Sequence, residues 1–178
     1  MAEKILKTPK GELRWAKVLT PDTTFKEEGE YSIEAFFDKD DVNDLIAEID
    51  EEAEMQLKVS KKSKQIASVP YEHTDDGKVR FKFKQRAKYK DIIFQVGVYD
   101  NENKEWDKQT KIGNGSKGRI AFSLYGWDFT GKGVGVTAQL KAVQVIEHVA
   151  YDASGPSDFG FEAVEGNASS RNEVDVPF

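Results

Sequence analysis

The chain has 178 residues, with 26 Lys and Arg against 32 Asp and Glu, two histidines and no cysteine. This length suits one domain with a single core. The lack of cysteine excludes a disulfide scaffold, a thiol nucleophile and a thiolate zinc site, and His73 and His148 alone leave little for an imidazole cage. No apolar run is long enough to cross a bilayer, and the first residues lack the apolar stretch of a signal peptide, so we expect no membrane partner and a cytoplasmic protein.

The net charge of −6 conceals a strong segregation of charge along the chain. Residues 38–54 carry nine acids against Lys39, and residues 151–178 carry six acids against Arg171. The remainder of the chain is therefore net positive. This asymmetry is typical of a basic surface accompanied by an acidic tail, so the overall charge does not argue against a polyanionic partner.

Two strands and a helix are predicted in the first third of the chain. Residues 11–37 form two strands around a connection that Pro21 and Gly29 punctuate, and residues 30–35 alternate polar and apolar side chains. Residues 40–58 predict a helix that covers the core, because apolar residues recur at steps of three and four. That apolar stripe comprises Val42, Leu45, Ile46, Ile49, Ala53 and Leu57, and the expected N-terminal caps are Asp38, Asp40 and Asp41.

Strands dominate the region from residue 79 to residue 149. Runs of β type occupy residues 79–90, 92–99, 119–124 and 133–149, after a turn at Asp75-Asp76-Gly77. The last run changes its alternation near Lys141-Ala142, which predicts a β-bulge or bend of the kind that a small barrel needs. We expect a mainly β domain over residues 1–150, namely a five-stranded Greek-key barrel of the oligonucleotide-binding (OB) fold with one inserted amphipathic helix. Residues 151–178 are expected to be a disordered acidic tail.

A basic strip is the strongest functional feature of the sequence. In a regular strand, six cations of residues 79–90 share one face: Arg80, Lys82, Lys84, Arg86, Lys88 and Lys90. Phe81, Phe83, Ala87 and Tyr89 are predicted to face the other way. Like charges in a row repel one another, and a polyphosphate backbone would relieve that repulsion. Lys111, Lys117 and Arg119 extend the positive charge, while the alternative is a solvated face without a ligand.

Aromatic residues accompany this charge. Tyr125 and Trp127 share the strand parity of Arg119, opposite to the predicted core, so they are candidates for stacking on nucleic-acid bases, with Trp15 and Trp106 as further candidates. The alternative is that each tryptophan closes the core. Residues 113–118, with the sequence GNGSKG, fit either a loop that approaches phosphate or a plain turn, because no helix follows them.

These residues together resemble the replication single-stranded DNA-binding proteins of short-tailed bacteriophages, of the gene 2.5 type. Three stretches carry the similarity, and they read FKFK at residues 81–84, IGNGSK at 112–117 and SLYGW at 123–127. The acidic tip Asp175-Val176-Pro177-Phe178 also looks like the Pro-Phe tip of bacterial single-stranded DNA-binding proteins.

The resemblance implies an OB-fold protein that binds single-stranded DNA without sequence preference during phage replication, recombination and repair, in the cytoplasm of the infected bacterial host. It implies no enzyme activity, cofactor or metal. Tyr125 would stack bases, and the tail, through Asp175, Val176, Pro177 and Phe178, would recruit the DNA polymerase and the helicase-primase, compete with DNA and support a homodimer. The alternatives are an RNA- or protein-binding OB-like module and a metal-dependent nuclease that uses Asp91 and Glu102.

Overall fold

The structure, a computed structural model, describes residues 4–24, 26–150, 162 and 164–166. The fold is mainly β with one long helix, as the sequence predicted. The first half contains β1 (Leu6–Lys7), β2 (Gly11–Asp22), β3 (Glu30–Asp38), a 3-10 turn (Lys39–Asp41), α1 (Asn43–Val59), β4 (Ile66–Ser68) and β5 (Tyr71–His73). The second half contains β6 (Lys78–Arg86), β7 (Lys88–Tyr89), β8 (Ile92–Ile93), β9 (Gly97–Tyr99), β10 (Lys117–Phe129) and β11 (Gly133–Glu147).

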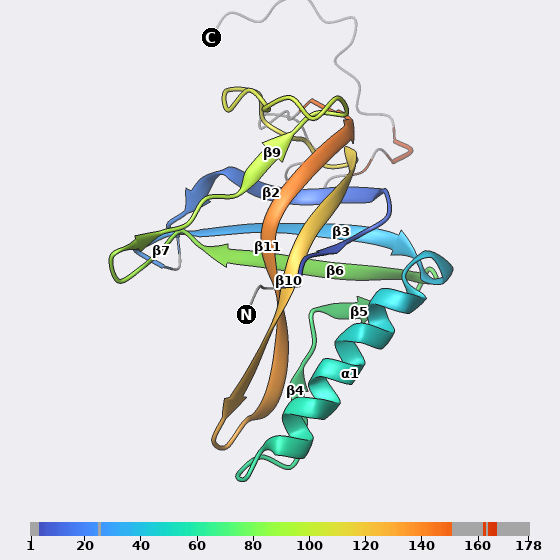
Figure 1. Cartoon of the computed structure of the whole chain (residues 1–178). Helices are drawn as coiled ribbons and strands as arrows, with labels where there is room; N and C mark the ends of the chain where they lie inside the picture. Colours follow the sequence, from blue (N-terminus) through green and yellow to red (C-terminus); the bar gives the residue numbers. More distant parts are fainter. Residues whose placement is uncertain (1–3, 25, 151–161, 163, 167–178) are drawn as a thin grey trace, which may run out of the picture.

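Five strands close into a barrel in the order β2, β3, β6, β11, β10 and back to β2. Strands β6 and β11 run parallel, and the other four neighbouring pairs are antiparallel. The two seams, β6 with β11 and β10 with β2, are short, as in the partly open Greek-key barrel of an OB-fold. The predicted barrel is therefore confirmed. In the sequence, α1 comes after the second barrel strand, β3, and before the third, β6, and in space it lies beside the β10–β11 hairpin (Figure 1).

Alternation of apolar residues along the strands builds the core. Phe81 and Phe83 of β6 are fully buried, and so is Phe122 of β10. The ring centroids of Phe83 and Phe122 lie 5.1 Å apart, which joins β6 to β10 across the barrel interior. Each buried phenylalanine removes apolar surface from water, which stabilises the fold by roughly 25 cal/mol for each Å² of apolar area buried. The same alternation sends the intervening residues of these strands outward.

The predicted bulge in β11 is present. Ala121 pairs with Ala142 while the next residue, Phe122, pairs with Leu140, so Lys141 is the extra residue. The bulge reverses the parity of β11, and both parts of the strand keep their apolar residues buried. Beyond the barrel, β10 and β11 continue as a long hairpin that closes at residues 130–132 (Figure 1).

Helix α1 packs against this hairpin, and its N-terminus differs from the prediction. It begins at Asn43 because the preceding residues form the 3-10 turn, and its N-cap is Val42, with no capping side chain. The expected aspartate caps are thus wrong. The Tyr71 hydroxyl of β5 donates to Asp50 Oδ1 at 2.5 Å and fastens the helix to the sheet. Burial and the Asp50 carboxylate raise the pKa of Tyr71 to about 12.

The predicted strand over residues 79–90 is shorter in the structure. β6 ends at Arg86 and the chain bends at Ala87, although the Ala87 amide still donates to the Gly29 carbonyl of the connection before β3 at 3.0 Å. Lys88 and Tyr89 then pair with β8 in a separate hairpin. Tyr89, which was expected to face the core, is 44% exposed, so that expectation is wrong.

Most of the predicted tail, including its tip at residues 175–178, lies outside the described residues. Within the part of the chain that the structure describes, no helix is both long and apolar enough to cross a membrane.

Candidate nucleic-acid interface

Three cations of β6 form the centre of the candidate interface, and we call Lys82, Lys84 and Arg86 the β6 strip. Their side chains are exposed, while the alternate residues of the strand are buried. None of the three forms an ion pair with a described residue. They are therefore free to meet an anionic ligand.

Arg80 does not join the β6 strip as the sequence predicted. Its Nε lies 3.4 Å from Glu34 Oε1, and its guanidinium also contacts the Glu72 carboxylate. Two acids thus engage this side chain, and a phosphate would have to displace them. The sequence feature that could have indicated the ion pair with Glu34 is the acidic residues within 30–38. Which of them reaches Arg80 depends on the register between β3 and β6, which only the folded sheet shows.

The strand β3 carries acids opposite the ends of the β6 strip. Glu34 pairs in register with Lys82, and Glu30, which is bound to Lys26 Nζ at 2.7 Å, pairs with Arg86. Lys84 instead lies between neutral neighbours, Ser32 of β3 and Gln139 of β11. The centre of the strip is therefore its most uncompensated point.

The β7–β8 hairpin carries the next cations after the β6 strip, but in a separate hairpin and not in the same straight strand. Lys88 and Lys90 are exposed there, and the Tyr89 ring lies between cations: both Arg86 Cζ and Lys90 Nζ are 5.5 Å from its centroid. The next strand leaves Ile92 and Ile93 57% and 73% exposed. Tyr89 is an aromatic candidate that the sequence reasoning missed, because the assumed straight strand placed it inside.

A second candidate surface lies on the β10–β11 hairpin, and we call Tyr125, Trp127 and Phe129 the hairpin aromatics. Tyr125 and Phe129 are 57% and 58% exposed. Trp127 is partly buried: it lies across Gly135, where a Cβ would overlap the indole, and its Nε1 donates to Thr137 Oγ1 at 3.2 Å. The Phe129 ring is 5.1 Å from Trp127. Phe129 was missed, although it continues the parity of residues 125 and 127.

The register of the barrel places the hairpin aromatics beside the β6 strip. Lys84 of β6 pairs with Gln139 of β11, which pairs in turn with Ser123 of β10. Tyr125 of β10 pairs with Thr137, which lies two residues from Gln139 along β11. Tyr125 is therefore displaced from the Lys84 row by about 7 Å along the strands and about 10 Å across them. Residues from separate parts of the sequence thus share one outer face. This face and its bordering loops are where OB-folds bind oligonucleotides.

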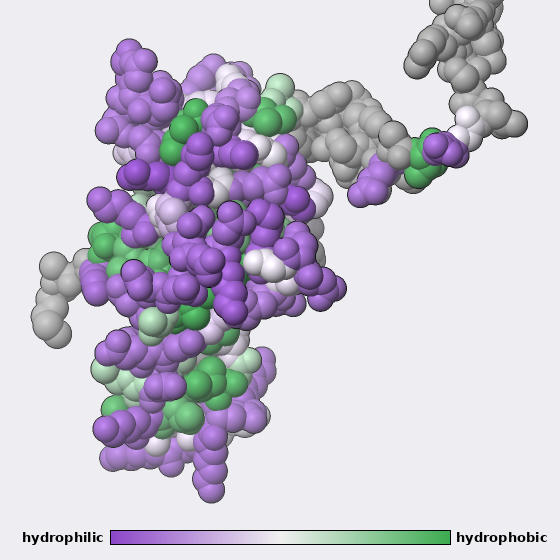
Figure 2. Space-filling view, turned by 90° about the vertical axis from the view of Figure 1, so that its right-hand side faces the viewer, coloured by the Kyte–Doolittle hydropathy of each residue, from purple (hydrophilic) through white to green (hydrophobic). Residues whose placement is uncertain are grey.

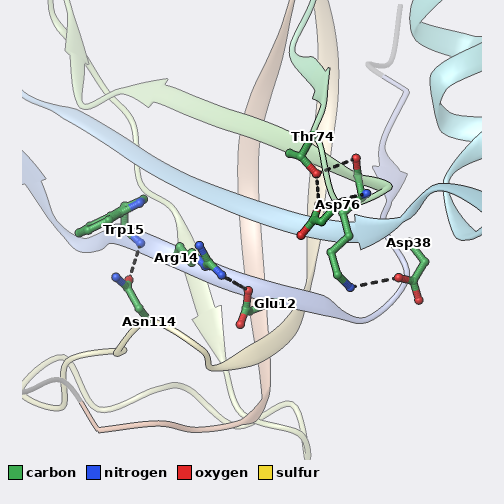
Figure 3. Close-up of polar contacts among 8 residues, drawn as sticks. Glu12, Arg14, Trp15, Asp38, Thr74, Asp76 and Asn114 are labelled. Atoms are coloured by element: carbon green, nitrogen blue, oxygen red, sulfur yellow. Dashed lines mark hydrogen bonds and ion pairs between the residues drawn. The ribbon is translucent and has the colours of Figure 1, made fainter. Parts of the chain in front are cut away.

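Trp15 occupies a groove at another edge of the barrel. The residue is 53% exposed, has a left-handed φ of 54°, and donates its backbone N–H to Asn114 Oδ1 at 2.8 Å (Figure 3). The groove holds about 650 Å³ and is lined by Trp15, Ala16, Lys17, Leu19, Thr20, Pro21, Asp22, Thr23, Lys108, Gln109, Lys111, Ile112 and Asn114. Lys17 is held there by Asp22 at 2.8 Å, and this contact, with bonds from Thr24, lowers the pKa of Asp22.

Two further predicted cations lie away from the hairpin aromatics. Lys117 and Arg119 are at the opposite end of β10, where they pair with Glu147 and Gln144. Arg119 is six residues from Tyr125, or about 20 Å along the strand. The structure therefore does not bring these two cations together with the stacking candidates, whereas Lys111 lines the Trp15 groove.

The glycine-rich segment 113–118 is a structural turn. The amide of Gly113 donates to Val149 O, that of Gly115 to Leu13 O, and that of Ser116 to Gly113 O. These donors are committed to the fold. Trp106 is also structural, since its Nε1 donates to Thr110 O at 2.8 Å and its ring packs against His148.

The structure does not support the alternative of a metal-dependent nuclease that uses Asp91 and Glu102. Asp91 lies in the turn of the β7–β8 hairpin, while Glu102 is in another turn and pairs with Lys104 at 3.2 Å. Among the residues that can be placed, no three Asp, Glu or His side chains gather where they could hold a metal ion.

An OB barrel with unpaired cations beside exposed aromatics defines a class of protein suited to single-stranded nucleic acid. Comparison with known proteins agrees with this class. Residues 9–148 match the sequence model of a family described as single-stranded DNA-binding protein, bacteriophage T7. The chain belongs to this family, whose members are DNA-binding proteins and not enzymes.

Solved structures show the same fold at low sequence identity. The crystal structure of gp2.5, a single-stranded DNA-binding protein encoded by bacteriophage T7, matches with a TM-score of 0.76 and 23% identity, covering 94% of this chain and 99% of that chain. The single-stranded DNA-binding protein of bacteriophage Enc34 in complex with single-stranded DNA matches with a TM-score of 0.65 and 15% identity, covering 83% and 88%. A comparison with curated proteins gave no significant match.

Proposed function

We propose that the β6 strip and the hairpin aromatics bind single-stranded DNA without sequence preference. The observation that carries the proposal is the outer face that Lys84 and exposed Tyr125 share, two strands apart, where Lys84 has no ion-pair partner among the described residues. Family membership and the DNA-bound Enc34 relative support it.

The cations and the aromatics have separate tasks in this binding. Lys82, Lys84 and Arg86 neutralise backbone phosphates, which releases counterions and makes affinity fall with salt. Tyr125, Tyr89 and the partly exposed Trp127 offer faces on which any base can stack, each contact being worth roughly 1–3 kcal/mol. Neither task reads base edges, so affinity depends little on sequence. Binding of this kind needs no cofactor.

We further propose that the protein works in phage DNA replication, recombination and repair inside the infected bacterial cell. Its acidic segment, which includes Asp175-Val176-Pro177-Phe178, would recruit the DNA polymerase and the helicase-primase, and it would support a homodimer. The segregation of acidic charge into residues 151–178 supports this, because such a segment can bind basic surfaces on partners and on this chain itself.

Fluorescence titration of the full chain with oligo-dT, duplex DNA and an oligo-U of equal length tests the binding proposal. We expect quenching by oligo-dT that weakens with salt, and weaker binding of the duplex. A preference for oligo-U would favour an RNA-binding module, since only contacts to the 2′-hydroxyl select RNA. Absence of binding to all three would leave the β6 strip as a solvated face.

A further inference from the structure

The segment that follows α1 is rich in lysine and lies at the end of the β10–β11 hairpin. We call Lys61, Lys62 and Lys64 the lysine loop; Lys58 of α1 and Lys132 of the hairpin turn flank it. All five side chains are exposed, and none forms an ion pair with a described residue. Lys58 stabilises the negative end of the helix dipole, but the lysine loop lies beyond the helix and has no such role.

Hydrogen bonds hold the lysine loop against the hairpin. The Ser60 hydroxyl donates to Asp128 Oδ2 at 2.7 Å, and the Ser63 hydroxyl donates to the other oxygen of the same carboxylate. Gln65 closes the segment: its Nε2 donates to Lys132 O at 2.8 Å, and its carbonyl accepts from the Val134 amide at 3.0 Å. The three lysines therefore keep a defined position beside the hairpin turn.

Asp128 does not neutralise these lysines. Its two oxygens accept from the two serine hydroxyls, and those bonds, with the charge of Lys62, lower its pKa. Of the five lysines, Lys62 is the one whose charge acts on this carboxylate. In Figure 2, the lower part of the molecule, where α1 and the hairpin end lie, carries hydrophilic side chains around a small apolar patch.

The lysine loop and the hairpin aromatics lie on opposite faces of the hairpin, and the hairpin turn connects them. Asp128 stands between Trp127 and Phe129 in β10, so its side chain and the lysine loop are on one face of the hairpin and the aromatics on the other. The turn at residues 130–132, with Lys132, joins the two faces. A DNA backbone that passed exposed Phe129 and turned around the end of the hairpin would therefore meet Lys132 and then the lysine loop.

We infer that the lysine loop and Lys132 hold the phosphates of the same single strand after it passes the hairpin aromatics, which extends the binding site beyond the barrel. The inference rests on the proposed function. It predicts that long oligonucleotides reach contacts that short ones do not.

The test compares two triple variants of the full chain. K61A/K62A/K64A removes the lysine loop, and K10A/K39A/K104A removes the same charge from exposed lysines elsewhere. Each is titrated at several salt concentrations with oligo-dT of about 5 and about 16 nucleotides, near the limits of OB-fold site sizes. At about 0.7 per phosphate, the loop variant should lose about 2 from the slope of log K against log[salt] with the long oligonucleotide only.

The outcomes separate this inference from the proposed function. K61R/K62R/K64R should restore the slope, because it keeps the charge. The extension is wrong if the loop variant and the control variant have the same salt slope with the long oligonucleotide. It is also wrong if the loop variant loses the same amount of slope with both lengths. In either case, binding by the wild type would still support the proposed function. Failure of the wild type to bind either oligonucleotide overturns both. Circular dichroism melting of each variant checks that the exposed substitutions leave the fold intact.

Discussion

At the scale of single residues, exposure separates side chains that serve the fold from those available to a ligand. Tyr125 is 57% exposed, and its hydroxyl has no hydrogen-bond partner among the described residues. Trp106, in contrast, is bound through its indole nitrogen and packed on His148. Trp127 is intermediate, because it both covers Gly135 and presents part of its ring. The cleanest test of stacking is therefore Tyr125.

Tyr125→Ala should weaken binding of oligo-dT by roughly 5- to 150-fold, the equivalent of 1–3 kcal/mol, because one stacking face is lost. The thermal midpoint should hardly change, since the side chain is exposed. Tyr125→Phe keeps the ring and should bind like the wild type. Fluorescence titration and thermal melting measure the two quantities, and wild-type affinity in Tyr125→Ala would remove the stacking role.

Removing Lys82 and Lys84 together should reduce the salt dependence of binding. Each phosphate contact contributes about 0.7 to the slope of log K against log[salt], so K82A/K84A should lose about 1.4. A matched control, K39A/K104A, removes the same charge far from the strip and should leave the slope unchanged. Equal slopes for the two double variants would exclude the β6 strip from the interface.

At the scale of elements, the position of α1 depends on a few side-chain contacts with the sheet and the hairpin. The Tyr71–Asp50 hydrogen bond joins the helix to β5, and the Gln56 side chain packs on the backbone of Gly126 in the hairpin. The helix thereby supports the face of the hairpin opposite to the aromatics. The contribution of the Tyr71–Asp50 contact can be tested through the pH dependence of stability.

The raised pKa of Tyr71 predicts a loss of stability in alkali. The folded-state pKa is about 12, above the usual value of 10.0, because the fold disfavours the phenolate. This contribution is fully present below pH 10 and disappears as the pH rises through about 12. Denaturant unfolding across this range should show that Tyr71→Phe, which cannot ionise, loses less stability than the wild type. Equal losses in both proteins would show that Tyr71 does not titrate in this way.

At the scale of the whole molecule, basic and acidic charge are segregated along one chain. The β6 strip and the lysine loop carry positive charge on the described domain, while residues 151–178 are net acidic. An anionic segment can compete with DNA for a cationic surface within the same chain.

Removal of residues 151–178 should therefore tighten oligo-dT binding, with the largest gain at low salt, where charge attraction is least screened. It should also abolish any binding of the polymerase and the helicase-primase, which we propose as partners of this segment. Titration of the full chain and of the 1–150 form, at two salt concentrations, measures the first effect. If affinity is the same in both forms, the acidic segment does not compete with DNA and serves partners alone.

The mainly β barrel, the outward face of β6 and the bulge near Lys141 could be predicted from the sequence, because strand alternation is a local property with a period of two residues. Tertiary contacts set where β6 gives way to the β7–β8 hairpin, and they separate Arg80 from the β6 strip, since Glu34 and Glu72 reach Arg80 from other strands. They also place Lys84 and Tyr125 on one face, although these residues belong to different strands, β6 and β10. Such pairings join residues remote in the chain, and no local periodicity encodes them.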